Sequence, residues 1–222
     1  MKIALDGPSG AGKSFLAKAI AKKLAIVYVD TGALYRTIGL YVKRNGVKPD
    51  DTQAVEALLP EINLELKYVD SAQKVILCGE DVGDAIRTPE MSMYASAVSA
   101  IPAVRTFLLD IQRDIAKENS VIMDGRDIGT VIFPDAEVKI FLTASPEARA
   151  KRRYLELCEK GIKTTYEEVL EDMKLRDKND STRDVAPAVA AEDAVVLDNS
   201  ELDEEGTVLA ALEIIRSKTG VK

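Results

Sequence analysis

The stretch GPSGAGKS, residues 7–14, lies between the apolar run KIALD (2–6) and the periodic segment FLAKAIAKKLA (15–25). Its spacing fits G-x-x-x-x-G-K-[ST], the loop that wraps phosphates between a strand and a helix. A glycine-rich turn without a ligand is the alternative. However, Lys13 and Ser14 fall in register after the last glycine, where a charge and a hydroxyl can meet phosphate and Mg²⁺. We therefore predict a nucleoside triphosphate site formed by Gly7, Pro8, Ser9, Gly10, Ala11, Gly12, Lys13 and Ser14.

The composition is that of a single globular domain. The chain has 222 residues, 46% of them hydrophobic, and a formal net charge of −7. This size fits one α/β domain, residues 1–222, that carries an insertion. The acidic charge argues against a nucleic-acid partner, which needs a basic face. No signal peptide or membrane-length apolar run is found, so we expect a cytoplasmic protein without a membrane partner, and nothing visible demands more than a monomer.

Histidine is absent from the chain. Its absence excludes Ser-His-Asp and Cys-His catalysis and histidine-ligated metals. Cys78 and Cys158 lie far apart, which excludes a cysteine-based zinc site. Phosphoryl transfer remains possible, because it depends on positioning and on charge neutralisation by Lys, Arg and Mg²⁺.

Short apolar or β-branched runs alternate with helical periodicity along the chain. Such runs suit strands that are buried on both faces, and together they predict a five-stranded parallel sheet with flanking helices. The predicted strands are KIALD (2–6), AIVYV (25–29), SVIMD (120–124), VKIFL (138–142) and AVVLD (194–198).

A different pattern occupies residues 61–82. Apolar and polar residues alternate from Ile62 to Tyr68, the chain turns at Asp70-Ser71, and the alternation resumes. This pattern predicts an antiparallel β hairpin. A hairpin within an α/β alternation indicates an inserted subdomain, to which we assign approximately residues 61–90.

Two clusters of polar residues follow predicted strands. VDTGALYR (29–36) lies at the edge where open α/β sheets bind ligands, although a capped helix with Asp30 or Thr31 as its N-cap explains it equally well. In MDGRDIG (123–129), Asp124 stands at a strand end where a Walker-B aspartate would hold Mg²⁺. Asp-Gly is also a strong turn signal, but an acidic strand tip beside a phosphate loop favours function.

Several arginines stand out in this acidic chain. EARAKRR places Arg149 and Arg153 four residues apart, on one helix face. KLRDKNDSTR adds Arg176 and Arg183 on a later helix, whose start shows a capping-box spacing from Thr164 to Glu167. Arginine matches the geometry of phosphate oxygens, so two such helices suggest a hinged cover, or lid, over a triphosphate at approximately residues 149–184.

These motifs, taken in order, resemble the bacterial cytidylate kinases, which move a phosphoryl group from ATP to CMP or dCMP. The similarity runs from the first strand to the last and rests on GPSGAGKS, DTGALYR, IRTPE, SAIPAVR, MDGRDIGTVIFPDA, KIFLTAS and DSTRDVAP. It implies a P-loop NTPase fold with an enlarged nucleoside-binding insertion and a helical lid. One departure is Phe15, where the family usually has a threonine that contacts the donor's α-phosphate.

The resemblance also implies roles for individual residues. Ser14 and Asp124 would hold Mg²⁺ with ATP. The residues implied in catalysis are Lys13, Arg126, Arg153, Arg176 and Arg183. The residues implied in CMP binding are Thr31, Tyr35, Arg36, Ser96, Arg105, Arg126, Asp127, Asp180 and Arg183. Among the latter, Ser96, Arg105 and Asp127 would face the cytosine and Asp180 the sugar hydroxyls.

Three other functions are compatible with a phosphate loop. A GTP switch protein would share it, but no Asn-Lys-x-Asp guanine motif occurs in the chain. A nucleotide-binding module without turnover would not need a second set of phosphate-sized arginines. A kinase with another acceptor, UMP or AMP, stays open, and an acceptor screen distinguishes all of these.

Overall fold

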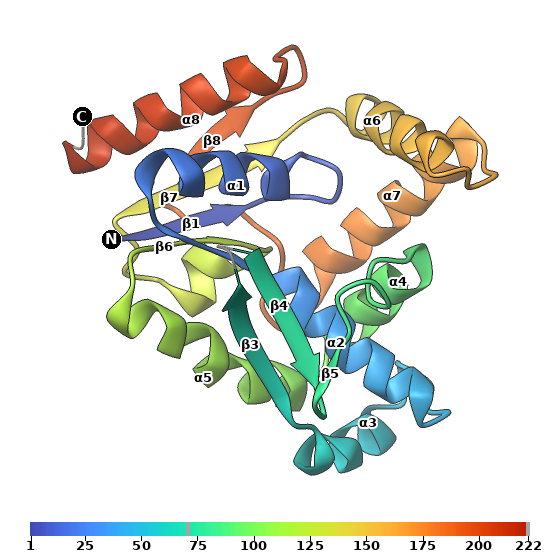
Figure 1. Ribbon diagram of the computed structural model, residues 1–222. Helices are drawn as coiled ribbons and strands as arrows, with labels where there is room; N and C mark the ends of the chain where they lie inside the picture. The colour runs from blue at the N-terminus through green and yellow to red at the C-terminus, as the bar shows by residue number, and fades with distance from the viewer. Residues whose placement is uncertain (70–71, 221–222) are drawn as a thin grey trace.

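A five-stranded parallel sheet forms the centre of the computed structural model, which describes residues 1–69 and 72–220. The strand order is β2-β6-β1-β7-β8, and every neighbouring pair is parallel (Figure 1). The strands are β1 (Lys2–Asp6), β2 (Val27–Asp30), β6 (Val121–Asp124), β7 (Val138–Thr143) and β8 (Val195–Asp198). Each overlaps a run predicted from the sequence, so the predicted parallel sheet is confirmed.

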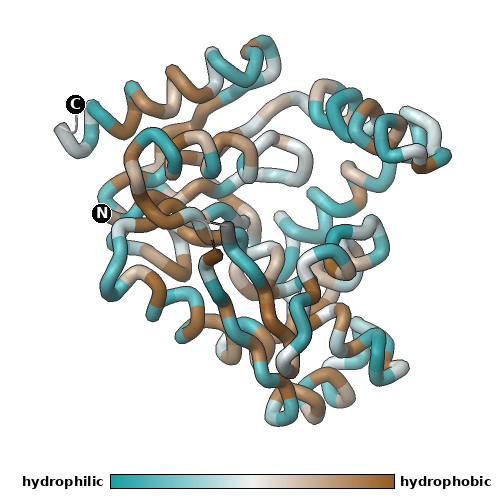
Figure 2. The backbone as a smooth tube through the Cα atoms, viewed as in Figure 1, coloured by the Kyte–Doolittle hydropathy of each residue, from teal (hydrophilic) through white to brown (hydrophobic). Residues whose placement is uncertain are grey.

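Helices cover both faces of this sheet, and the alternation of side chains along the strands explains why. Ile3 and Leu5 of β1 pack with the first and last helices of the chain, whereas Ala4 between them packs with the residues after β6. Figure 2 shows the resulting apolar interior. The helices concerned are α1 (Lys13–Leu24) and α8 (Glu204–Thr219) on one face, with α5 (Pro102–Glu118) and the short π-helix η2 (Ile128–Ile132) on the other.

The predicted hairpin is present, within a larger insertion. Leu64 to Val69 pair with Ala72 to Leu77 in antiparallel register, and the predicted turn at Asp70-Ser71 lies outside the described residues. A third, two-residue strand completes a small sheet that the sequence did not indicate. The elements from the second helix onward are α2 (Thr31–Arg44), α3 (Thr52–Leu58), η1 (Leu59–Glu61), β3 (Leu64–Val69), β4 (Ala72–Leu77), β5 (Glu80–Asp81) and α4 (Pro89–Val98).

The inserted sheet shares its core with α2. Leu64, Val75 and Leu77 belong to the same buried cluster as Leu34 and Ile38 of α2. A displacement of the small sheet therefore acts directly on α2, the helix that begins at the edge of the parallel sheet.

The region predicted to be a lid is formed by α6 (Pro146–Glu159) and α7 (Tyr166–Thr182), which share a small core of Ala150, Leu157, Val169 and Met173. The predicted capping box is off by one residue. Thr165 has an extended backbone and accepts from the N–H of Glu168, whose carboxylate accepts from the N–H of Thr165. The Thr164 hydroxyl lies outside the helix and donates to the same carboxylate.

Among the described residues no single helix is long and apolar enough to cross a membrane. Helices α4 and α5 reach the required length and composition only together, and they are bent by 103° at the break between them. Val98, Ile101 and Val104 around that break are buried in the cluster shared with α2.

Candidate active site

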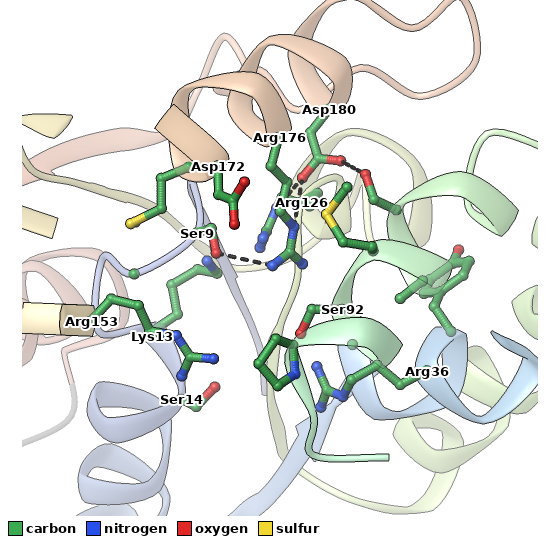
Figure 3. Close-up of a pocket in the computed structure, with 18 of the residues that line it drawn as sticks. Ser9, Lys13, Ser14, Arg36, Ser92, Arg126, Arg153, Asp172, Arg176 and Asp180 are labelled. Atoms are coloured by element: carbon green, nitrogen blue, oxygen red, sulfur yellow. Dashed lines mark hydrogen bonds and ion pairs between the residues drawn. The ribbon is translucent and has the colours of Figure 1, made fainter. Parts of the chain in front are cut away.

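A cleft of about 800 Å³ opens at the carboxyl ends of the strands, between the phosphate loop, the start of α2, α4 and the lid (Figure 3). This is the edge at which parallel α/β sheets bind ligands. Most of the residues selected from the sequence line it. They are Ser9, Gly10, Gly12, Lys13, Ser14, Thr31, Tyr35, Arg36, Ser96, Arg105, Asp124, Arg126, Asp127, Arg153, Arg176, Asp180 and Arg183.

The phosphate loop has the backbone that its glycines predict. Gly10 and Gly12 have φ values of 73° and 90°, and α1 begins directly after them, at Lys13. The Lys13 ammonium is buried and donates to the carbonyl of Pro8 at 2.7 Å. Burial, with the nearby charge of Arg126, lowers the pKa of Lys13 well below its ordinary value. An anion in the loop would offset this unfavourable burial of charge.

Three residues of the loop, Gly7, Pro8 and Ala11, do not line the cleft, although the sequence placed them in the phosphate site. Gly7 has a structural requirement instead. Its φ is 146°, and a Cβ there would lie 1.9 Å from the carbonyl oxygen of Leu142 on β7. Ala11 is fully buried, and its carbonyl accepts from the side chain of Asn199. Gly7 and Ala11 thus hold the loop against β7 and against the residue that follows β8.

Ser14 and Asp124 lie together, as the metal-site prediction requires. The Ser14 hydroxyl donates to Asp124 Oδ2 at 2.7 Å, and Tyr28 OH donates to Oδ1 at 3.3 Å. Burial, with the charge of Asp30, raises the pKa of Asp124 to about 6. A hydroxyl and one carboxylate beside a phosphate loop fit Mg²⁺, which takes few protein ligands and completes its shell with phosphate oxygens and water.

The start of α2 presents Thr31 and Arg36 to the cleft. Asp30 caps the helix by accepting from the N–H of Ala33 at 2.9 Å, and it accepts from Arg36 Nη2 at 2.8 Å. The segment 29–36 therefore fits both interpretations that the sequence allowed, a capped helix and a ligand-binding edge. Asp30 caps the helix, and Arg36 lines the cleft. Thr31 Oγ1 donates to the carbonyl of Asp124, which joins this corner to the metal-site residue.

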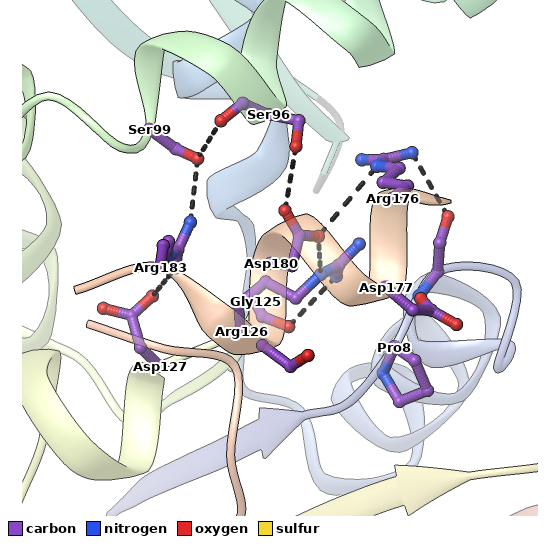
Figure 4. A network of polar contacts seen from close by, with 12 residues as sticks. Pro8, Ser96, Ser99, Gly125, Arg126, Asp127, Arg176, Asp177, Asp180 and Arg183 are labelled. Carbon is purple, nitrogen blue, oxygen red and sulfur yellow. Dashed lines mark hydrogen bonds and ion pairs between the residues drawn. The ribbon is translucent and has the colours of Figure 1, made fainter. Parts of the chain in front are cut away.

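A second group of arginines surrounds Asp180 of α7 (Figure 4). Asp180 accepts from Arg126 Nε at 3.1 Å and from Ser96 Oγ at 2.9 Å, and Arg176 Nε lies 4.0 Å away. Burial alone would raise the pKa of Asp180, but Arg126 and Arg176 hold it below its ordinary value. Burial, with Arg126 nearby, lowers the pKa of Arg176 to about 10. So concentrated a positive charge in a cleft favours an anionic ligand.

The third group lies beneath α4 and joins Arg105, Asp127 and Arg183. Arg105 Nη2 forms a short ion pair with Asp127, and Arg183 Nη2 lies 3.8 Å from the same carboxylate. Both arginines also contact Ser99, Arg105 at its carbonyl and Arg183 at its hydroxyl. Burial raises the pKa of Asp127 against the opposing effect of the two arginines. These groups provide paired donors and acceptors at one end of the cleft.

The lid arginines divide into two kinds. Arg153 lines the cleft and pairs with Glu156, whereas Arg149 is 4% exposed and does not line the cleft. Arg149 Nη1 donates to the carbonyl of Ser9 at 2.9 Å and to Asp177 at 2.6 Å. The sequence interpretation of Arg149 as part of a phosphate-facing cover is therefore wrong for this residue, because its guanidinium is used to fasten the lid to the loop.

Sequence reasoning missed several residues that support the site. Asp6 accepts from the N–H groups of Ile128 and Gly129 at 2.8 Å each, just after Arg126 and Asp127. Asp6 is the last residue of the first predicted strand, and this position at the ligand-binding edge of the sheet could have indicated a role in the site. Asn199 and Gln73 act through contacts across more than forty positions of the chain, and no local pattern indicates them.

A phosphate loop and a group of arginines that face the same cleft, beside the helices α6 and α7, define a P-loop kinase of small molecules. The model of the cytidylate kinase family matches residues 3–217. The chain belongs to the cytidylate kinase family, and it is an enzyme that transfers phosphoryl groups.

Known relatives agree over nearly the full length. The chain is 50% identical over 220 residues to the cytidylate kinase of Caldicellulosiruptor saccharolyticus, covering 99% of this chain and 97% of the relative. It is 50% identical over 221 residues to that of Fervidobacterium nodosum, covering 100% and 99%. A crystal structure of an uncharacterized protein from Eubacterium ventriosum is similar in fold, with a TM-score of 0.54, 14% identity, and coverage of 98% and 99%.

Proposed function

We propose that this enzyme transfers the γ-phosphoryl group of ATP to CMP or dCMP, producing ADP and CDP or dCDP. The observation that carries this proposal is the pair of anion sites in one cleft. Lys13 and Ser14 lie at the phosphate loop, and Arg36 and Arg126 face the same cleft from other elements. Cytidylate kinase relatives at 50% identity support the choice of acceptor.

The reaction requires no general base from the protein. A nucleoside monophosphate loses its second proton near pH ~6, so the acceptor oxygen is already anionic at neutral pH. That oxygen attacks the γ-phosphorus in line, the new P–O bond forms, and the bond to the bridging oxygen of ADP breaks. A chain without histidine is consistent with this chemistry.

The main obstacle is the repulsion between two anions. Lys13 and Arg176 reach the donor side, because Arg176 Nη1 donates to Ser9 Oγ of the phosphate loop at 3.2 Å. Arg36 and Arg126 serve the acceptor phosphate, and Arg153 of the lid completes the cluster. Preorganised cations that meet charge as it develops are the largest source of catalysis in such sites.

Mg²⁺ is the proposed cofactor, and Ser14 and Asp124 are the residues that would hold it with ATP. When bound, the ion neutralises charge on the donor phosphates. For this role the Asp124 carboxylate must be ionised, and the hydroxyls of Ser14 and Tyr28 already donate to it.

The nucleoside part of CMP is assigned to the end of the cleft beneath α4. Ser96, Arg105 and Asp127 face the cytosine, Tyr35 lies below Arg105, and Asp180 serves the sugar hydroxyls. The lid (149–184) and the insertion (61–90) close over the substrates and exclude water, which would otherwise hydrolyse ATP. We place this activity in a cytoplasmic monomer that acts on free nucleotides.

An acceptor screen tests the proposal. Purified protein, ATP and Mg²⁺ are mixed with CMP, dCMP, UMP or AMP, and ADP release is followed by a coupled assay. We expect the largest kcat/KM with CMP or dCMP. A preference for UMP or AMP would identify another monophosphate kinase, and ATP binding without product would identify a binding module.

A further inference from the structure

Gln73, on the middle strand of the inserted sheet, is hydrogen-bonded to both backbone polar groups of Asp30. The N–H of Asp30 donates to Gln73 Oε1 at 2.8 Å, and Gln73 Nε2 donates to the carbonyl of Asp30 at 3.2 Å. β2 is an edge strand of the parallel sheet, so among the described residues no further strand pairs with its outward backbone groups. One neutral side chain therefore fixes the last residue of β2 to the insertion.

The carboxylate of Asp30 in turn holds the side chain of Arg36. It accepts from Arg36 Nη2 at 2.8 Å while it caps α2 at Ala33. A side chain at Gly32 would disturb this arrangement, since its Cβ would lie 2.9 Å from Arg36 Nη1 and 3.1 Å from Asp30 Oδ1 and the guanidinium would have to shift. The position of the guanidinium is thus set by the residue that Gln73 holds.

Arg36 still has donating capacity for a ligand. Its side chain is 20% exposed and lines the cleft, and its Nε is a buried atom without a hydrogen-bond partner among the described residues. An unpaired buried donor is costly, and an anion that accepts from it recovers that cost. Figure 3 shows the Arg36 side chain directed into the cleft, on the side opposite the lid.

We propose that Gln73 is a positioning residue for the acceptor phosphate, which it serves through Asp30 and Arg36. The inference rests on the proposed function, because it takes the phosphate of the acceptor nucleotide as the anion that Arg36 binds. Since the inserted sheet shares its core with α2, its position determines whether Gln73 can hold Asp30. The insertion thereby controls affinity for the phosphate, in addition to any contact it makes with the nucleoside.

The test compares Gln73→Met with Lys74→Met. Methionine keeps the length of glutamine and removes both hydrogen bonds, whereas Lys74 is the next residue on β4 and pairs only with Asp81 of the same small sheet among the contacts described. Binding of CMP is measured by calorimetry without ATP. Binding of cytidine, which lacks the phosphate, is measured by its competition with CMP for the same protein. Without these hydrogen bonds Asp30 no longer holds the Arg36 guanidinium in place before the phosphate binds, so we expect about tenfold weaker CMP binding for Gln73→Met, with cytidine changed less than about twofold. Lys74→Met should match wild type.

A second arm asks whether Gln73 acts through Arg36. In an Arg36→Met background, adding Gln73→Met should change CMP affinity by less than about twofold, because coupled residues are not additive. Unchanged CMP binding in Gln73→Met, equal losses for CMP and cytidine, or additive losses with Arg36→Met would each overturn the proposal. If wild type prefers a different acceptor, the proposed function fails. The same comparison of that nucleotide with its nucleoside then decides the role of Gln73.

Discussion

Arg176 of α7 donates from Nη1 to the hydroxyl of Ser9 at 3.2 Å, so a lid arginine and the phosphate loop are in direct contact. Arg149 and Asp177 strengthen this connection, since Arg149 binds the carbonyl of Ser9 and Asp177 binds its N–H. Arg183, one residue beyond α7, lies instead against Ser99 and Asp127. The two lid arginines that the sequence grouped together thus serve different parts of the cleft.

This division predicts different kinetic effects for the two arginines. Arg176→Ala should lower kcat by about 100-fold or more while CMP affinity changes less than about threefold, because its guanidinium meets charge at the transferring phosphoryl group. Initial-rate kinetics and calorimetry with CMP measure the two quantities. A comparable loss in both would place Arg176 in ground-state binding of the acceptor.

Arg183→Ala is the matched variant, at the C-terminal end of the same helix. It removes a partner of Asp127 and Ser99, so we expect weaker CMP binding, by about tenfold, in addition to any loss of turnover. If Arg183→Ala lowers kcat alone and leaves CMP binding intact, the residue acts only when both substrates are enclosed, and its contact with Ser99 in this structure is incidental.

Lys13→Ala should nearly abolish transfer and leave the fold intact. Lys13 is 7% exposed and burial lowers the pKa of its ammonium, so the substitution relieves an unfavourable charge in the free enzyme while it removes charge stabilisation during transfer. We expect turnover to fall by more than about 100-fold, with a thermal midpoint equal to or above that of wild type. A fall of less than about tenfold would contradict the role assigned to Lys13.

The sequence predicted those features that depend on neighbouring residues. The loop of 7–14, the five strand runs and the polar clusters after β2 and β6 all follow from local spacing, and the structure brings them to one edge of the sheet. The same reasoning could not assign Arg149, because an arginine that lines a cleft and one that binds the backbone of Ser9 look identical in a helix pattern.

Contacts across the chain explain the remaining gaps. Gln73 reaches Asp30 only because the insertion folds back against the edge of the sheet. A glutamine at position 73 does not by itself predict that contact. The strand β5 is two residues long, too short for any alternation to appear. The helix start near Thr164 was misplaced by one position, since both threonines have a glutamate three residues later.

Base selectivity should depend on the group beneath α4. Cytosine presents an amino donor where uracil presents a carbonyl, so Asp127 suits CMP and repels UMP, and Arg105 suits the acceptor atoms of cytosine. A mismatched buried polar group costs on the order of 1 to 3 kcal/mol, so wild type should favour CMP over UMP by at least about tenfold in kcat/KM. The Asp127→Ala, Arg105→Met and Ser96→Ala variants should reduce that ratio.

The matching control is thermal unfolding of the same variants. Asp127 is buried and pairs with Arg105, so some loss of stability is expected from either substitution. If stability falls but the CMP to UMP ratio is unchanged in all three variants, these residues only support the fold and the assignment to the base is wrong.

Gly7→Ala should destabilise the protein strongly. A Cβ at this position would lie 1.9 Å from the carbonyl of Leu142, and φ is 146°. The β7 backbone would have to shift, so we expect a loss of more than about 3 kcal/mol in the free energy of unfolding. Gly46→Ala is the control, since Gly46 has a φ of 69° but no atom within 4 Å of its Cβ position, and it should cost only about 1 to 2 kcal/mol. Equal losses in the two variants would show that backbone conformation, and not the approach to Leu142, dominates.

Asp6 gives the fold a defined pH dependence. Burial, only partly offset by the N–H groups of Gly129 and Ile128, raises the pKa of Asp6 from 3.8 to about 6. Between these two values the folded chain holds a proton that the unfolded chain releases, so this carboxyl contributes stability below pH ~4 that is lost as the pH rises to about 6. Relative to Asp6→Asn, which cannot titrate, wild type should lose on the order of 2 to 3 kcal/mol of unfolding free energy across that window and nothing further above it. Urea unfolding of both proteins at pH 4, 5, 6 and 7 measures the difference. A difference that stays constant with pH would mean that Asp6 is ionised throughout and that the two backbone donors outweigh its burial.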